Sequence, residues 1–158
     1  MRLSQILIFL LLFLTLHTPK CIAQTASSQD SVYQRMIEMK PNYPEGLRWT
    51  NNNSYRSKAG PAGLGCHAFA LLLSDAAFGT SPIRMHKNLD QLQVGDMIRL
   101  NRNTHTVIVL KIDSLNVTLA EGNYNKSVHW GRTMRRENLP FKANYILTRY
   151  PEETGLSN

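Results

Sequence analysis

A central apolar segment constrains the fold of this 158-residue chain more than any other feature. Residues Cys66–Phe78 read CHAFALLLSDAAF, and apolar side chains fall on nearly every side of the helix that this spacing predicts. The glycine-rich loop before the segment and Gly79 after it mark the two ends of that helix. A helix that is apolar all round is stable only when other elements surround it, so we expect it at the centre of the fold.

The chain changes character after this helix. Before it, Ser28–Lys40 predicts a shorter helix, and residues 42–65 are rich in turn formers and predict loops. After it, β-branched residues recur between turn signals, although Arg132–Leu139 fits neither pattern. The expected strands are Met97–Leu100, His105–Ile112, Val117–Glu121, Ser127–Trp130 and Tyr145–Arg149. Helices followed by an antiparallel meander predict an α+β fold.

The first residues, Met1–Ala23, have the pattern of a secretory signal peptide. Arg2 supplies the positive end, Ile6–Leu16 supplies the apolar core, and the small residues Cys21 and Ala23 precede the expected cut. The apolar core is shorter than the ~20 residues that a membrane-spanning helix needs, which disfavours an uncleaved anchor. We therefore expect a secreted or periplasmic protein without stable membrane insertion after cleavage.

The mature chain, residues 24–158, is long enough for one domain with its own core. The full chain has a net charge of +7, and its leader contains no acidic residue, so the mature protein remains basic. That charge suits an anionic partner such as cell-wall polymer or an acidic peptide, although a basic surface exposed to solvent explains it equally well. We expect a monomer. We also expect no binding of nucleic acid, because no basic stripe is interleaved with aromatic residues.

Cys66 is the only thiol that the mature chain should keep, because Cys21 lies in the leader and the sequence contains two cysteines. Exported proteins normally pair their cysteines, so an unpaired one is a candidate nucleophile. The free N–H groups and the dipole at a helix start favour an anion and lower the pKa of a thiol. The alternative is a small core residue, which is common for a cysteine in an apolar helix.

A thiolate nucleophile works with an imidazole and with a third group that orients the imidazole. His105 opens the strongest predicted strand, and Glu121 ends the next one. In a fold with helices followed by an antiparallel meander, the start of the His105 strand and the end of the Glu121 strand can both face the start of the central helix. Asn123 points to the same side as Glu121 if that strand continues, and it is the alternative orienting residue.

The remaining histidines define the rival assignments. His67 follows Cys66 directly, so on a helix it points about 100° away and makes a poor base for the thiol. His129 lies on a predicted strand and is the alternative base. A zinc site formed by Cys66, His67, His105 and His129 lacks the usual CxxC, HxxxH and HExxH spacings, so we expect neither a metal nor an organic cofactor.

Three segments together resemble the CHAP and NlpC-type branches of the papain-like superfamily of cysteine hydrolases. They read GLGCHAFALLLSDAAFG, VGDMIRLNRNTHTVIVLKI and VTLAEGNYN, and the resemblance covers about Ser54–Asn125. It implies a papain-like α+β fold, in which N-terminal helices, with the cysteine-bearing helix at the centre, pack on an antiparallel meander or half-barrel. It also implies hydrolysis of amide bonds in bacterial cell-wall peptide, by amidase or endopeptidase action.

The resemblance assigns a role to each matching position. It makes Cys66 the nucleophile, His105 the base and Glu121 the orienting residue. Tyr55 lies near the position of a tyrosine that lines the oxyanion site in NlpC-type enzymes.

Four further residues are candidates for a substrate groove, although places in the core suit the aromatic ones equally well. They are Trp49, Tyr124, His129 and Trp130.

The chain also departs from the pattern. His67 and Ala68 follow the cysteine where NlpC-type enzymes have Ser-Gly, and no wall-binding repeat is present. These departures leave two alternatives open. One is a catalytically inactive binding module, and the other is an acyltransferase or deamidase that uses the same Cys-His pair.

Overall fold

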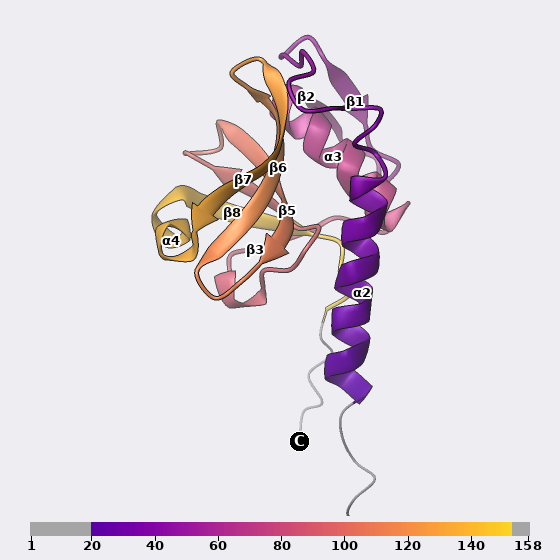
Figure 1. Cartoon of the computed structure of the whole chain (residues 1–158), viewed down its shortest axis with the longest axis vertical. Coiled ribbons are helices and arrows are strands. Elements are labelled where there is room, and N and C mark those ends of the chain that lie inside the picture. Colours follow the sequence, from indigo (N-terminus) through magenta and orange to yellow (C-terminus); the bar gives the residue numbers. More distant parts are fainter. Residues whose placement is uncertain (1–19, 153–158) are drawn as a thin grey trace, which may run out of the picture.

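Helices lie mainly in the N-terminal half of the chain and strands in the C-terminal half, which is the predicted α+β arrangement (Figure 1). The computed structural model describes residues 20–152. The helical elements are α2 (Lys20–Ile37), α3 (Gly65–Phe78), α4 (Leu139–Lys142), and the 3₁₀ turns η1 (Leu89–Gln91) and η2 (Arg136–Asn138). The strands are β1 (Ser54–Arg56), β2 (Ala62–Leu64), β3 (Arg84–His86), β4 (Met97–Leu100), β5 (His105–Ile112), β6 (Asn116–Tyr124), β7 (Ser127–Arg135) and β8 (Ala143–Thr148).

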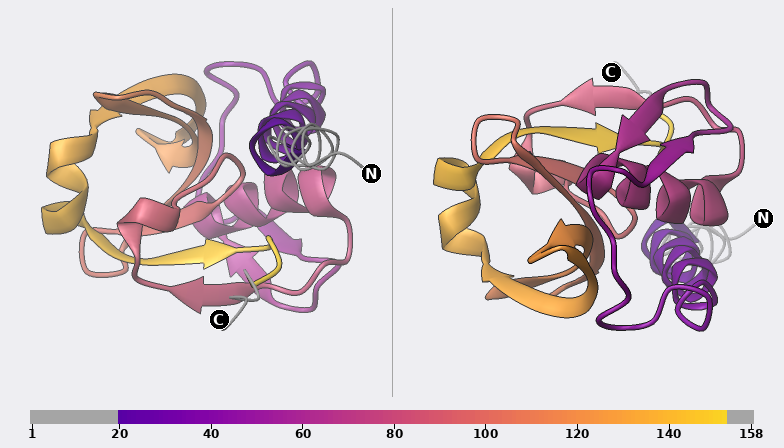
Figure 2. Two further views of the ribbon diagram at one scale, coloured as in Figure 1. Left: turned by 90° about the horizontal axis from the view of Figure 1, so that it is seen from below. Right: turned by 90° about the horizontal axis from the view of Figure 1, so that it is seen from above.

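Six of the strands form one antiparallel sheet in the order β3-β8-β4-β5-β6-β7. The strands from β4 to β7 are the predicted meander, and β8 returns to pair with β4. Figure 2 shows that the sheet curls strongly, with α2 and α3 on one side of the molecule and α4 on the other. β1 and β2 form a separate hairpin beside α3.

The structure corrects several predicted boundaries. β6 and β7 are longer than expected because a bulge carries the pairing past Glu121, and a two-residue turn then joins the strands. That turn consists of Asn125 and Lys126, both with left-handed φ angles, of 48° and 63°. Residues 42–65, predicted as loops, contain the hairpin β1–β2. Strands of three residues are too short to produce a readable alternation.

β5 is buried on both faces and divides the core into two clusters. Ile108 and Leu110 point to the side of α2 and α3, where they join Phe69 and Leu71. The alternate residues, such as Val107, point to the inside of the curled sheet. The strand therefore reads as an almost continuous apolar run, which explains why its sequence signal is the strongest in the chain.

α3 is the predicted central helix and begins one residue earlier than expected, at Gly65. It packs on β5 and β6, on the hairpin β1–β2, and on α2. The approach of β6 is close, because a Cβ atom added at Gly122 would lie 2.6 Å from the Cβ of Phe69 and 2.7 Å from Cδ1 of Trp49. The predicted burial of this helix is confirmed, with Phe69, Leu71 and Leu73 fully enclosed.

α2 differs from the predicted helix at both ends. It ends at Ile37 because Met39 and Lys40 donate to carbonyls three residues earlier and close tight turns. Ser31, near the expected start, lies inside the longer helix, where its hydroxyl donates to the Ser28 carbonyl at 3.0 Å. Most of the predicted leader lies outside the described residues, and Lys20–Ala23 form the first turn of α2. Among residues 20–152, no helix has both the length and the apolar character needed to cross a bilayer.

A buried ion pair joins α3 to the end of the chain. The carboxylate of Asp75 contacts the guanidinium of Arg149, and both side chains are almost completely enclosed. Asp75 also accepts hydrogen bonds from the hydroxyls of Tyr55 and Ser57 and from the Lys58 N–H. Burial alone would raise the pKa of Asp75, but these bonds and the guanidinium hold it below its usual value. The pair thereby fastens the hairpin β1–β2 to α3 and to the residue after β8.

Candidate active site

The backbone before Cys66 is shaped by Gly65. This glycine has a φ angle of 54°, and its N–H donates to the Asn53 carbonyl at 2.9 Å. A Cβ atom here would lie 2.4 Å from Oδ1 of Asn51, so only glycine fits. The N-cap residue, Leu64, offers no side-chain hydrogen bond to the first turn of α3. Cys66 therefore lies beside helix N–H groups that no capping side chain occupies.

The Cys66 thiol is free and only 8% exposed. The Thr106 N–H donates to its sulfur at 3.4 Å. Burial raises the pKa of this thiol, but hydrogen bonding with His105 and with the Thr106 N–H outweighs it, so the pKa lies below its usual value. The surroundings of Cys66 therefore favour the thiolate, which is the nucleophilic form.

His105 stands between the thiol and a buried carboxylate. Its Nε2 atom lies 2.6 Å from Oε2 of Glu121, which leaves Nδ1 for the sulfur of Cys66. Burial lowers the pKa of His105, but hydrogen bonds with Cys66 and Glu121 raise it more, to about 9. The lowered pKa of Cys66 and the raised pKa of His105 both favour a thiolate beside an imidazolium.

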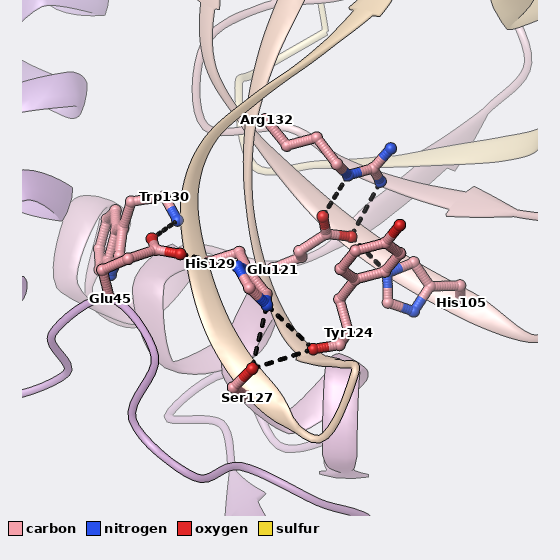
Figure 3. Close-up of polar contacts among 8 residues, drawn as sticks. All are labelled: Glu45, His105, Glu121, Tyr124, Ser127, His129, Trp130 and Arg132. Carbon is pink, nitrogen blue, oxygen red and sulfur yellow. Dashed lines mark hydrogen bonds and ion pairs between the residues drawn. The ribbon is translucent and has the colours of Figure 1, made fainter.

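Arg132, on β7, completes the cluster and was not among the predicted residues. Its Nε and one terminal nitrogen contact the two oxygens of Glu121, the latter at 2.9 Å, while Glu121 itself is fully buried (Figure 3). Burial alone would raise the pKa of Glu121. The bonds with His105 and Arg132 lower it by more, so the pKa lies below its usual value and the carboxylate stays charged. A buried glutamate needs a cation, and arginine grips both carboxylate oxygens at once.

The sheet explains why these residues meet. Arg132 is the register partner of Leu119, and Met134 that of Val117, so Arg132 continues a row of side chains on one face. The three apolar members of that row belong to the core cluster inside the curled sheet. Glu121 follows Leu119 by two residues and faces the same side. The charged cluster therefore forms the polar end of an apolar interior.

The two alternative assignments lead to other contacts. Nδ2 of Asn123 donates to Oδ1 of Asn51 at 2.7 Å, so Glu121 is the residue that contacts the imidazole of His105. His129 lies with its Nδ1 atom 2.7 Å from Oε1 of Glu45. Within residues 20–152, no three His, Cys, Asp or Glu side chains gather in a way that could hold a metal ion.

The predicted aromatic residues fall into two groups. Trp49 and Trp130 contact the ring of Phe69, and their indole N–H groups donate to the carbonyls of Gly65 and Tyr43, so both serve the core. Tyr124 is 42% exposed, and its ring centre lies 6.4 Å from that of His105.

Tyr55 lines the same pocket as Cys66. Its hydroxyl donates to Asp75 at 2.9 Å, and burial together with that carboxylate raises the pKa of Tyr55 to about 12.

An open pocket of about 570 Å³ adjoins the thiol. Its walls come from the hairpin β1–β2, the start of α3, and the β4–β5 region. The side chains that shape it include Tyr55, Arg56, Leu64, Cys66, His67 and Arg99. Cys66 is therefore part of the pocket wall, whereas the buried Glu121 is not among the residues that line the pocket.

No protein-family model and no curated protein matches the chain. A solved structure described as "The crystal structure of Ly7917" is similar over 76% of this chain, with 12% identity and a TM-score of 0.48. The matched region spans 61% of that protein. A similarity at this TM-score does not define the fold or the chemistry of the chain.

Proposed function

We propose that this protein is an exported cysteine hydrolase with a papain-like fold, which cleaves amide bonds in bacterial cell-wall peptide. The observation that carries the proposal is the line of contacts from the Cys66 thiol through His105 to the buried Glu121. The leader pattern, the basic charge and the resemblance of the three sequence segments favour the cell wall as the substrate.

In the first half of the reaction, the thiolate of Cys66 attacks the carbonyl carbon of the amide and forms a C–S bond. The N–H of Cys66 at the start of α3 stabilises the oxyanion. His105 then gives its proton to the leaving nitrogen as the C–N bond breaks, and a thioester remains. Glu121 keeps the imidazole oriented and stabilises its positive charge.

In the second half, His105 takes a proton from water, and the resulting hydroxide attacks the thioester. The C–S bond breaks, the acid product leaves, and Cys66 returns to the thiolate beside a protonated His105. An amine in place of water would give acyl transfer with the same residues, so the final acceptor distinguishes a hydrolase from a transferase.

Digestion of purified sacculi by the exported protein tests the proposal, with released fragments identified by mass spectrometry. We expect fragments that have gained one water at an amide bond, and none with Cys66→Ser. Fragments joined to an added amine would indicate a transferase. The absence of any product from sacculi or wall peptides would contradict the proposal and favour a binding module.

A further inference from the structure

The pocket beside Cys66 carries positive charge that no acidic side chain on its walls balances. Arg56 and Arg99 both line it, and none of the lining residues is Asp or Glu. Among the described residues, neither arginine forms an ion pair with a carboxylate. Other arginines in the protein do have acidic partners, as Arg132 and Arg149 show.

Arg99 projects from β4 next to the reacting atoms. Its terminal nitrogens contact the hydroxyl of Thr106 and the carbonyl of Asn103, which are both uncharged. Its Nε atom is buried and has no hydrogen-bond partner within the described part of the chain. Because Thr106 also donates its N–H to the sulfur of Cys66, one residue separates the guanidinium from the nucleophile.

Two titratable groups near the pocket, His67 and Asp75, do not change its net positive charge. Burial and the charge of Arg99 both lower the pKa of His67, which therefore adds no positive charge of its own near neutral pH. Asp75 lies behind Tyr55, but Arg149 already neutralises it. Arg56 stands exposed on β1 and, among the described residues, donates only to the Gly60 carbonyl, at 3.2 Å.

We infer that this pocket binds a carboxylate of the substrate next to the scissile amide, with Arg99 as the contacting cation and Arg56 at the rim. The substrate class is thus a peptide with a free carboxylate beside the bond that is cleaved. The identity of the substrate rests on the proposed function, whereas the preference of the pocket for an anion does not.

A pair of alkylating reagents tests that preference without any hydrolysis. Iodoacetate and iodoacetamide both form an S–CH₂ bond with the thiolate and release iodide, and they differ only in the carboxylate. The ratio of their rates at Cys66 cancels any change in the pKa of the thiol. Relative to the ratio for N-acetylcysteine amide, we expect at least about a fivefold preference for iodoacetate, as for one charge contact near water.

The imidazolium of His105 also attracts anions. Variants of Arg99 therefore show which of the two cations causes the preference for iodoacetate. Arg99→Gln should lower the rate ratio several-fold, and Arg99→Lys should retain most of it. Lys87→Gln removes one positive charge from an exposed residue outside the pocket and should leave the ratio unchanged. An unchanged ratio in Arg99→Gln, or an equal fall in Lys87→Gln, would overturn the inference.

Matched peptides then connect the pocket to the substrate. Once the cleaved bond is known, the acidic residue beside it is replaced by its amide, Glu by Gln. We expect kcat/KM to fall by about tenfold for the wild-type protein and little for Arg99→Gln. Hydrolysis without a preference for the acid would refute this inference and leave the proposed function standing. Anion-selective alkylation without hydrolysis of any wall peptide would do the reverse.

Discussion

The Nε2 atom of His105 lies 2.6 Å from Oε2 of Glu121, and this carboxylate has no exposure to solvent. Arg132 holds the carboxylate from the other side. An isolated buried carboxylate would become protonated, but the two cationic partners keep this one charged. The imidazole is therefore held in one orientation by a group that cannot move away into water.

Replacement of Cys66 by serine should abolish amide hydrolysis and leave the fold intact. The volume hardly changes, but a serine hydroxyl is scarcely ionised near neutral pH and is a far weaker nucleophile than a thiolate. Product formation from sacculi measures activity, and circular dichroism with thermal melting checks the fold. Turnover by the variant would rule out Cys66 as the nucleophile, and loss of cooperative melting would support a role in the core.

Glu121→Gln should lower kcat by about 100-fold or more, whereas Asn123→Ala should change it by only about a few-fold. The glutamine keeps the shape of the side chain but loses the charge that stabilises the imidazolium of His105. Asn123 contacts Asn51 instead of the imidazole. Steady-state kinetics of the two variants makes the comparison, and a larger loss in Asn123→Ala would move the orienting role to that residue.

The activity should fall on the alkaline side as His105 loses its proton. The pKa of His105 is raised to about 9 by its bonds with Cys66 and Glu121, so kcat/KM should decline above about that pH. Glu121→Gln removes one of the groups that raise this pKa and should move the alkaline decline to lower pH. An alkaline limb at the same pH in wild type and variant would show that another group controls it.

Arg132→Gln should weaken the site through Glu121, which makes Arg132 a positioning residue. In the wild type, the positive charge of Arg132 lowers the pKa of Glu121, so this pKa should rise in the variant. The acid side of the kcat/KM profile should therefore move to higher pH, and kcat should fall less than in Glu121→Gln. Arg135→Gln, on the same strand but paired only with the exposed Glu137, is the matched control. Identical pH profiles for the two arginine variants would refute the role.

Asp96→Asn should stabilise the fold more at pH 8 than at pH 4. Burial raises the pKa of Asp96 from 3.8 to about 7, and one of its oxygens has no partner among the described residues. The folded state therefore favours the protonated form, and this stabilisation is lost as the pH rises from about 4 to about 7. Asparagine stays neutral at every pH and can still accept the Gln93 N–H, which the carboxylate accepts at 2.8 Å.

Thermal unfolding of wild type and Asp96→Asn across this range measures the effect. The difference between the two midpoints isolates Asp96, because the other carboxyl groups titrate in both proteins. A difference that does not depend on pH would contradict the assignment.

The elements with long apolar patterns could be predicted from the sequence, and they carry the predicted site. α3 and β5 are buried on nearly all sides, so their composition alone marks them and fixes Cys66 and His105 at their starts. Glu121 could be predicted because it ends the readable part of β6, Val117–Glu121, although the strand continues to Tyr124. These three assignments remain predictions about chemistry, although the structure brings the side chains together.

Arg132 could not be found in the same way. Its strand, β7, alternates poorly in hydrophobicity, and its partner across the sheet depends on a register shift between Leu119 and Ala120. A shift of one residue would turn Arg132 to the opposite face. Such a shift leaves no trace in local composition, so only the folded sheet shows that Arg132 meets Glu121.

The buried pair of Asp75 and Arg149 also ties the wall of the pocket to the end of the described chain. The two residues are 74 positions apart, and Arg149 comes later than every residue of the Cys66 cluster. Until that arginine docks, Asp75 is an unpaired charge in the interior, and the hairpin it anchors cannot settle as a wall of the pocket. Bringing together two residues so far apart in the sequence costs loop-closure entropy, which the contacts around Asp75 must offset. The shape of the pocket beside Cys66 therefore depends on a residue that follows the last strand of the sheet.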